Sequence, residues 1–207
     1  MREIELPRSM LKCVIRSLLS FPSVSKTMEP HQVSKHPGSE WVIDRKYSTV
    51  EFVAKRLFVF TLKGSFLEIE GTIRRDEGAV SRSYVEAVIK SAGVHTGTRG
   101  WDVRLQSAEF LDSETYPEIR FESATVEKGR DRHTLKVTGD LSLRGTTRQL
   151  ELEVEEVDHS ISPQGEEVAY YASVVEIDRH LFGMTRRAVL LGRKIRIRLQ
   201  IQALRIV

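Results

Sequence analysis

Hydrophobic and polar residues alternate along most of the chain after position 40. The last segment shows this most clearly, because apolar side chains at positions 195, 197, 199, 201 and 203 alternate with lysine, arginine and glutamine. Successive side chains of a β-strand point to opposite sides, so this pattern predicts a strand with one buried and one solvated face. By related patterns we predict about eight strands, in residues 41–52, 63–75, 85–90, 119–126, 135–141, 150–155, 168–177 and 194–203.

Short turn sequences separate these strands, among them the glycine-containing runs at 76–78, 128–131, 144–146 and 162–165. No helix long enough for a parallel crossover lies between consecutive strands, so the pattern predicts mainly antiparallel hairpins. Closure into a barrel would remove the edges of such a sheet. A two-sheet sandwich is the structural alternative, since alternation alone does not exclude it.

The stretch from 96 to 112 has a different pattern. Trp101, Leu105 and Phe110 recur at helix-like intervals after two glycines. We therefore predict an all-β fold, a closed antiparallel barrel of about eight strands with one or two short helices that cap one end. An eight-stranded barrel has an interior wide enough for packed side chains or for one small ligand.

Residues 1–39 lack this periodicity. We interpret them as a flexible leader and linker, and residues 40–207 as the barrel domain. A degenerate export signal from Met10 and a short amphipathic membrane helix are the alternatives. Lys12 and Arg16 interrupt the apolar stretch around Cys13. The uninterrupted apolar runs that remain are shorter than the 7–15 apolar residues of a secretory signal core. The absence of a credible signal favours a cytoplasmic location over a periplasmic or secreted one.

Composition narrows the class further. Of the 207 residues, 40% are hydrophobic and 29% are charged, with a net charge of +3. These values exclude a wholly disordered chain and a polytopic membrane protein, and the small positive excess gives no argument for nucleic acid. The single cysteine, Cys13, excludes an intrachain disulfide framework and a cysteine-cluster zinc site.

The sequence contains no recognisable catalytic constellation. The six histidines are scattered without metal-ligand spacing, and no GxGxxG, P-loop or GxSxG motif occurs. We therefore expect neither an enzyme nor a bound metal or cofactor. A small lipid-modifying enzyme is the remaining catalytic alternative, with Asp102 and His180 as the first residues to test.

Several segments resemble, in order, the YceI-like polyisoprenoid-binding proteins. The matching stretches are Trp41-Val42-Ile43-Asp44, 48–57, 63–66, 71–73, 107–112, 116–123, 137–148 and 178–184, of which 137–148 is the most diagnostic. With the final alternating strand, the resemblance covers roughly residues 40–204. In the family, a His often follows the Lys of the first short helical turn. This chain has Arg56 at that position. It also departs in residues 101–107, which keep only Asp102, Leu105 and Ser107 of an Arg-Asp-x-His-Leu-Arg-Ser run.

The resemblance implies a lipocalin-like barrel that holds a long isoprenoid chain, polyprenyl or polyprenylated quinone-like, in an elongated apolar tunnel. Such proteins resemble carriers or reservoirs, and the implied role is transport, storage or protection of the lipid. Some family members form dimers, so a homodimer is a further expectation. The alternative is a packed barrel without a lipid ligand that serves as a stress-response or interaction module.

Under the binding hypothesis, inward-facing apolar residues form the site, because each buried CH₂ of a lipid tail contributes about 0.8 kcal/mol. The tunnel candidates are Phe52, Phe58, Phe66, Ile69, Ile73, Val85, Ile89, Leu105, Phe110, Phe121, Leu135, Val137, Tyr171, Phe182, Ile195 and Ile197. The candidate head-group contacts are Tyr84, Arg99, Asp102 and Arg104, with Tyr171 as a further one. The competing interpretation is that the apolar residues pack against one another and fill the barrel.

A cluster of basic residues lies near the C-terminus. It comprises Arg179, Arg186, Arg187, Arg193, Lys194, Arg196 and Arg198. A solvated outer face of the barrel is the ordinary explanation. A transient contact with an anionic membrane surface is the functional one. Nucleic acid is not an expected partner, because the cluster lacks interleaved aromatic residues.

Overall fold

Strands dominate the part of the chain that the structure describes. The computed structural model covers residues 38–56, 60–185 and 191–206. Its strands are β1 (Ser39–Ile43), β2 (Thr49–Arg56), β3 (Phe60–Phe66), β4 (Ile69–Arg75), β5 (Tyr84–Lys90), β6 (Val94–His95), β7 (Glu118–Lys128), β8 (Thr134–Leu143), β9 (Thr146–Ile161), β10 (Glu167–Asp178) and β11 (Lys194–Ile206). The helical elements are α2 (Arg99–Gln106) and the short 3-10 helices η1 (Val80–Arg82), η2 (Ser91–Gly93) and η3 (Arg179–Phe182).

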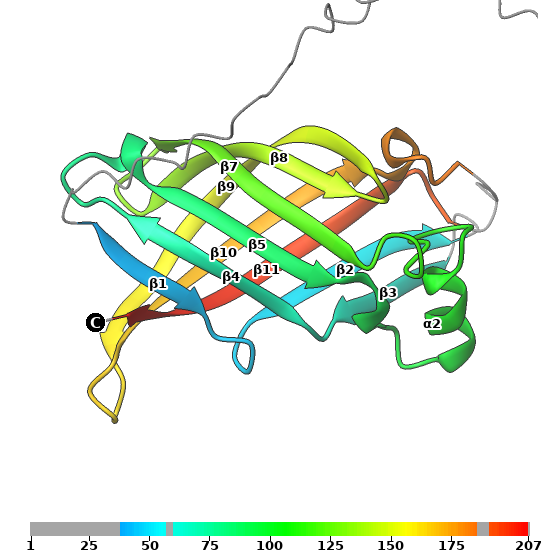
Figure 1. Cartoon of the computed structure of the whole chain (residues 1–207), viewed down its shortest axis with the longest axis horizontal. Coiled ribbons are helices and arrows are strands. Elements are labelled where there is room, and N and C mark those ends of the chain that lie inside the picture. The colour runs from blue at the N-terminus through cyan, green and yellow to red at the C-terminus, as the bar shows by residue number, and fades with distance from the viewer. Residues whose placement is uncertain (1–37, 57–59, 186–190, 207) are drawn as a thin grey trace, which may run out of the picture. The chain divides into compact units, whose positions relative to one another are not determined.

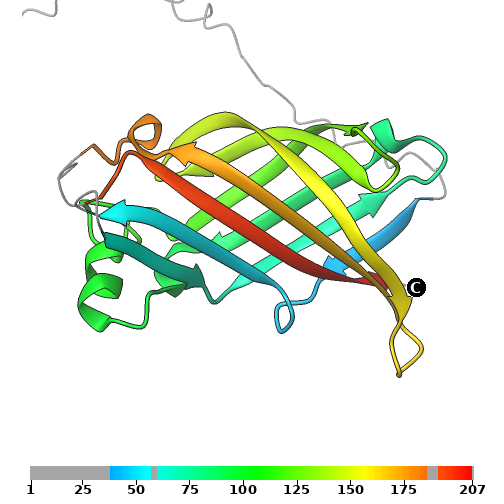
Figure 2. The same cartoon turned by 180° about the vertical axis from the view of Figure 1, so that it is seen from behind.

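Eight of the described strands form a closed antiparallel ring. Its order is β1-β4-β5-β7-β8-β9-β10-β11, and β1 pairs back with β11 to close it. Strand β11 is long enough to pair with two strands on the same side, β1 near its C-terminal end and β2 near its N-terminal end (Figures 1 and 2). The predicted closed barrel is therefore confirmed, and the sandwich alternative is wrong.

Two predicted strands are each divided in the structure. Residues 41–52 form β1 and the start of β2, because Asp44 begins a turn in which its carboxylate accepts a hydrogen bond from the Lys46 amide at 2.9 Å. Residues 63–75 form most of β3 and all of β4. At the break, the Leu67 amide donates to the Gly93 carbonyl and the Lys90 amide donates to the Glu68 carbonyl. The backbone there pairs with a distant segment, which local alternation does not reveal.

Helix α2 lies at one end of the barrel (Figure 1), and the segment 96–112 thus contains one of the predicted capping helices. We call this end the α2 end. Leu105 of α2 and the following Phe110 are buried with residues from η3 and the segment after it, Phe182, Met184 and Leu191. This apolar cluster covers the interior at the α2 end. The opposite end, which we call the η1 end, carries η1 and the turn between β7 and β8.

The predicted leader, residues 1–39, lies almost wholly outside the described residues, which begin at residue 38. Ser39 is already the first residue of β1, and its backbone pairs with Arg75 of β4. Trp41, the second residue after the predicted boundary at 39, is only 1% exposed. The first described strand thus begins at Ser39, and the interpretation of residues 1–39 as a flexible leader and linker stays a prediction.

Candidate functional site

The interior of the barrel encloses a cavity of about 870 Å³. Its wall is mainly aliphatic and phenylalanine side chains, which come from all eleven described strands. Ligand sites in proteins are concave, mostly apolar and furnished with few polar groups, in the range of about 300–1,000 Å³. The described side chains therefore leave room for a ligand instead of filling the barrel.

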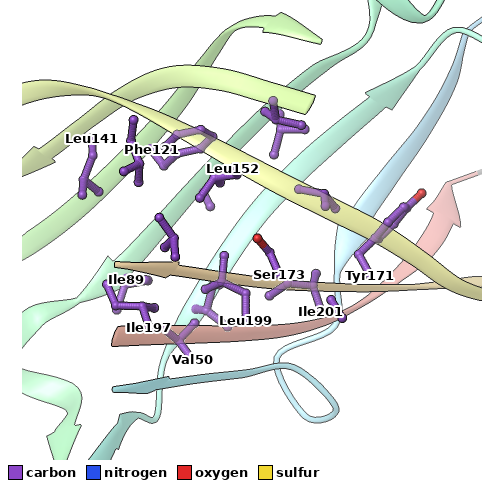
Figure 3. Close-up of a pocket in the computed structure, with 18 of the residues that line it drawn as sticks. Val50, Ile89, Phe121, Leu141, Leu152, Tyr171, Ser173, Ile197, Leu199 and Ile201 are labelled. Atoms are coloured by element: carbon purple, nitrogen blue, oxygen red, sulfur yellow. The ribbon is translucent and has the colours of Figure 1, made fainter. Parts of the chain in front are cut away.

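Strand alternation builds this wall directly. On β9 the even-numbered Leu150, Leu152 and Val154 line the cavity, while Glu151 and Glu153 between them are exposed. On β11 the odd-numbered residues from Ile195 to Ile201 line it in the same way. Figure 3 shows side chains from several strands converging on one interior space. The period-two pattern of the sequence thus determines which side chains face the cavity.

Most of the predicted tunnel residues line this cavity. Those at the wall are Phe52, Phe66, Ile69, Ile73, Val85, Ile89, Leu105, Phe110, Phe121, Leu135, Val137, Tyr171, Ile195 and Ile197. Phe182 does not line it. It is 4% exposed and packs in the apolar cluster at the α2 end, because η3 turns it against Phe110 and its neighbours. Phe58 lies outside the described residues. Contact of the lining residues with a ligand stays a prediction.

The four predicted head-group residues do not line the cavity. Tyr84 points outward, where its hydroxyl donates to Glu122 at 2.9 Å. Asp102 accepts hydrogen bonds from the amide and hydroxyl of Thr96 at 2.7 and 2.6 Å, so it fixes the start of α2. Arg104 lies over the Trp101 ring, and Arg99 is an exposed residue at the beginning of α2.

The polar groups that do reach the interior lie toward the η1 end. Arg75, the last residue of β4, donates from Nη1 to Oε1 of Glu156 on β9 at 2.6 Å. Tyr171 of β10 stands directly opposite Glu156 in the β9–β10 register. Two positions further along β10, Ser173 faces the same cavity and donates its hydroxyl to the Glu153 carbonyl at 2.7 Å. The apolar wall therefore ends in a small polar group, whose Tyr171 and Ser173 are labelled in Figure 3.

Both the guanidinium and the phenol of this group keep their protons. Burial raises the pKa of Tyr171, and the nearby Glu156 carboxylate raises it further, although the Arg75 charge opposes both. Burial alone would lower the pKa of Arg75. The hydrogen bond with Glu156 and the proximity of Tyr171 outweigh that effect, so the pKa of Arg75 is raised. At neutral pH this end of the cavity thus presents a cation, a carboxylate and a neutral hydroxyl donor.

Charged residues around the mouth at the η1 end are balanced in sign. Among the described residues that line the cavity, four are basic and four are acidic, namely Arg75, Lys128, Arg130 and Arg132 against Asp76, Glu77, Asp131 and Glu156. Some are also paired with residues outside the lining. Asp76 accepts from Nε of Arg82 at 2.8 Å, and Arg130 donates to Glu153 at 2.9 Å.

A signal for the polar group exists in the sequence. Extending the alternation of β9 by one step places Glu156 on the same face as Leu152 and Val154, and extending that of β4 places Arg75 on the face of Ile69 and Ile73. Charged residues at the end of an inward-facing series mark the end of the apolar interior. The series itself gives no indication that the two side chains meet.

A comparison with protein-family models matches residues 41–203 to a YceI-like domain. The chain belongs to the YceI-like family. The match covers most of the chain and includes every residue that lines the cavity.

Individual relatives agree with this assignment. The YceI protein of Escherichia coli O157:H7 is 32% identical over 130 residues, which cover 62% of this chain and 67% of that protein. Among solved structures, BcnA of Burkholderia cenocepacia superposes with a TM-score of 0.69 at 18% identity, covering 77% of this chain and 98% of BcnA. A polyisoprenoid binding domain from Saccharophagus degradans has a TM-score of 0.61 at 14% identity, with 80% and 98% covered. These two structures show that the fold is shared.

The YceI-like barrel carries no recognisable metal cluster within its described residues, since no group of three or more His, Cys, Asp or Glu side chains converges there. The described residues also contain no helix that is both long and apolar enough to cross a membrane.

The basic cluster near the C-terminus is divided by the structure. Arg179 is fully buried, and its guanidinium donates to the carbonyls of Met184, Leu191 and Gly192, so it belongs to no surface patch. Arg193 and Lys194 are exposed and paired with carboxylates of Asp178 and Glu176, while Arg198 lies 3.9 Å from Glu51. Arg186 and Arg187 lie outside the described residues. A contact of the remaining cations with an anionic membrane stays a prediction.

Proposed function

We propose that this protein binds one long-chain isoprenoid lipid, polyprenyl or polyprenylated quinone-like, inside its barrel and thereby transports, stores or protects it. The observation that carries the proposal is the apolar cavity of about 870 Å³ enclosed by the strands. A tail that enters such a cavity removes its methylene and methyl groups from water, at about 0.8 kcal/mol per buried CH₂. Binding of this kind requires no catalytic side chain.

Two further observations support the proposal. The cavity wall is continuous from the η1 end to the apolar cluster around Leu105 and Phe110, so a ligand can lie lengthwise between the strands. The chain is similar in fold to a polyisoprenoid binding domain from Saccharophagus degradans. A packed interaction module is the competing proposal, but the open interior does not favour it.

The direct test is mass spectrometry of an organic extract from the full chain, purified without denaturant after expression in its native host. A sample that is denatured and washed before extraction is the control. We expect one polyprenyl species at close to one molecule per chain, present only in the undenatured sample. A clean extract, together with no uptake of added isoprenoids by the washed and refolded chain, would contradict the proposal and favour the interaction module.

A further inference from the structure

The ion pair between Arg75 and Glu156 crosses the interior of the barrel. In the closed ring β4 and β9 are four places apart in either direction, so they lie on opposite walls. The Nη1–Oε1 distance of 2.6 Å therefore joins two walls near the η1 end. Their side chains are 29% and 18% exposed, so the pair lies between the apolar interior and the solvent.

Resting on the proposed function, we propose that Arg75, Glu156 and Tyr171 form the head-group site for the lipid. We further propose that this site selects an uncharged hydroxyl-bearing head group, an alcohol or a phenol, over a phosphate. The head group would then lie at the η1 end, and the tail would extend toward Leu105 and Phe110 at the α2 end.

The hydrogen-bonding capacity of the three side chains fits a hydroxyl. The guanidinium has N–H groups beyond the one used on Glu156, and the phenol of Tyr171 can donate. Glu156 is an acceptor and, within the described residues, Arg75 is the one side chain that its carboxylate bonds. A hydroxyl both donates and accepts, so it can bond to Glu156 and to either donor at once.

The charges argue against an anionic head group. Arg75 is already neutralised by Glu156, and the eight charged residues that line the cavity are balanced four to four. A phosphate at this position would lie beside the Glu156 carboxylate in a partly buried site, where like charges repel strongly. Sites that select phosphates instead present an excess of arginine or lysine.

The experiment compares three probes with matched tails on the delipidated full chain. They are squalene, which has no head group, hexaprenol, and hexaprenyl monophosphate. Retained ligand is measured by mass spectrometry after gel filtration over a range of probe concentrations. For the natural sequence we expect hexaprenol to bind roughly tenfold more tightly than squalene, as suits one or two added hydrogen bonds. Hexaprenyl monophosphate should bind more weakly than hexaprenol.

Two substitutions test the residues. Glu156→Gln removes the negative charge and keeps the shape of the side chain. It should therefore weaken the binding of hexaprenol and strengthen the binding of the monophosphate several-fold, so that the monophosphate becomes the preferred ligand. Tyr171→Phe should reduce the advantage of hexaprenol over squalene by about threefold to tenfold, because the phenol hydroxyl that would bond the head group is lost. The matched control is Glu155→Gln, whose side chain is exposed on the outer face next to Glu156 and should change neither ratio.

The outcomes separate the two proposals. If none of the three probes binds to the natural sequence, the proposed function fails. If squalene and hexaprenol bind but the phosphate is preferred, or both substitutions leave the ratios unchanged, the head-group site is overturned and the proposed function stands. Circular dichroism checks that each variant is folded, and Tyr171→Phe decides the matter if Glu156→Gln does not fold.

Discussion

Arg75 and Glu156 are 81 positions apart in the sequence, yet their side chains meet across the interior of the barrel at 2.6 Å. Each is the last inward-facing residue of an apolar series on its own strand, and the two strands stand on opposite walls of the ring. The pair thus marks where the apolar cavity gives way to a polar mouth. Beyond Glu156 the β9–β10 register shifts by one residue, so the alternation of β9 changes face at that point.

A bulky side chain inside the cavity should abolish lipid binding without unfolding the protein. Leu152 is 7% exposed and lies at the wall near Phe121 (Figure 3). We expect Leu152→Trp to exclude isoprenoid ligand, because the indole would occupy the space that the tail needs. Ligand is measured by mass spectrometry of extracts, and folding by circular dichroism. Gln149→Trp, at an exposed position of the same strand, should retain ligand. Equal ligand content in both variants would contradict the cavity assignment.

Arg179 should contribute strongly to stability. Its fully buried guanidinium donates to three backbone carbonyls near the α2 end, those of Met184, Leu191 and Gly192. Arg179→Met would leave these acceptors without their partner, and each buried unsatisfied group costs about 1–3 kcal/mol. We expect the free energy of unfolding to fall by about 3 kcal/mol or more in urea titrations.

The comparison for that variant is Arg193→Ala. Arg193 is 65% exposed and forms a surface ion pair with Asp178. Such pairs contribute about 0–1 kcal/mol, so this variant should unfold close to the natural sequence. Similar losses in the two variants would show that the buried carbonyl contacts have no special role.

Gly139 should not tolerate a methyl group. A Cβ at this inward position of β8 would come within 2.4 Å of the Glu122 carbonyl oxygen and 2.7 Å of the Phe121 ring. Gly139→Ala should therefore lower the free energy of unfolding by about 1–3 kcal/mol, as overpacking does. Gly100 in α2 has open space around it, and Gly100→Ala should raise stability by about 0.5–1 kcal/mol. Thermal unfolding of both variants measures the contrast, and a neutral Gly139→Ala would contradict the close approach.

Acid should destabilise the fold at the η1 end, where Asp76 lies. The pKa of Asp76 lies below its ordinary value of 3.8, because Arg82 and the Ala79 amide donate hydrogen bonds to its carboxylate. A lowered pKa in the folded state means that this stabilisation is present above pH 3.8 and is lost as the pH falls through the folded value. Asp76→Asn should thus be less stable than the natural sequence at neutral pH and approach it in strong acid.

Urea titrations from neutral pH downward measure this difference. Glu77→Gln, at the exposed neighbouring position, controls for the removal of one carboxylate. A gap between Asp76→Asn and the natural sequence that stays constant down to strong acid would show that the titration of Asp76 does not affect stability.

Substitution of Asp102 should destabilise the start of α2 and leave ligand selectivity unchanged. Its carboxylate accepts two hydrogen bonds from Thr96 and lies 3.4 Å from Nδ1 of His95. Asp102→Ala should lower the free energy of unfolding, because the charge-assisted hydrogen bonds from Thr96 are lost. The preference between hexaprenol and squalene should stay the same. A change in that preference would place the head group at the α2 end instead.

Alternation along the sequence determined which residues face inward, because the side-chain period of a strand is fixed by its backbone geometry. It therefore predicted the inward faces of β8, β9 and β11, and most of the residues that line the cavity. It also predicted that Trp101 and Leu105 belong to a helix. Local pattern could not show the break after Phe66, because the backbone groups there pair with a distant segment.

Of the polar group at the η1 end of the cavity, the sequence predicted Tyr171 but not Arg75 or Glu156. From the sequence, Tyr84 and Asp102 were reasonable polar candidates, but barrel closure turns Tyr84 outward and leaves Asp102 bonded to Thr96. Closure also brings Arg75 and Glu156 together from opposite walls. The alternating pattern thus predicted most of the strand segments and their buried faces, and the ordered motifs indicated the family. Only the folded ring decided that an open cavity remains and which charges meet at its mouth, because both depend on contacts between strands far apart in the chain.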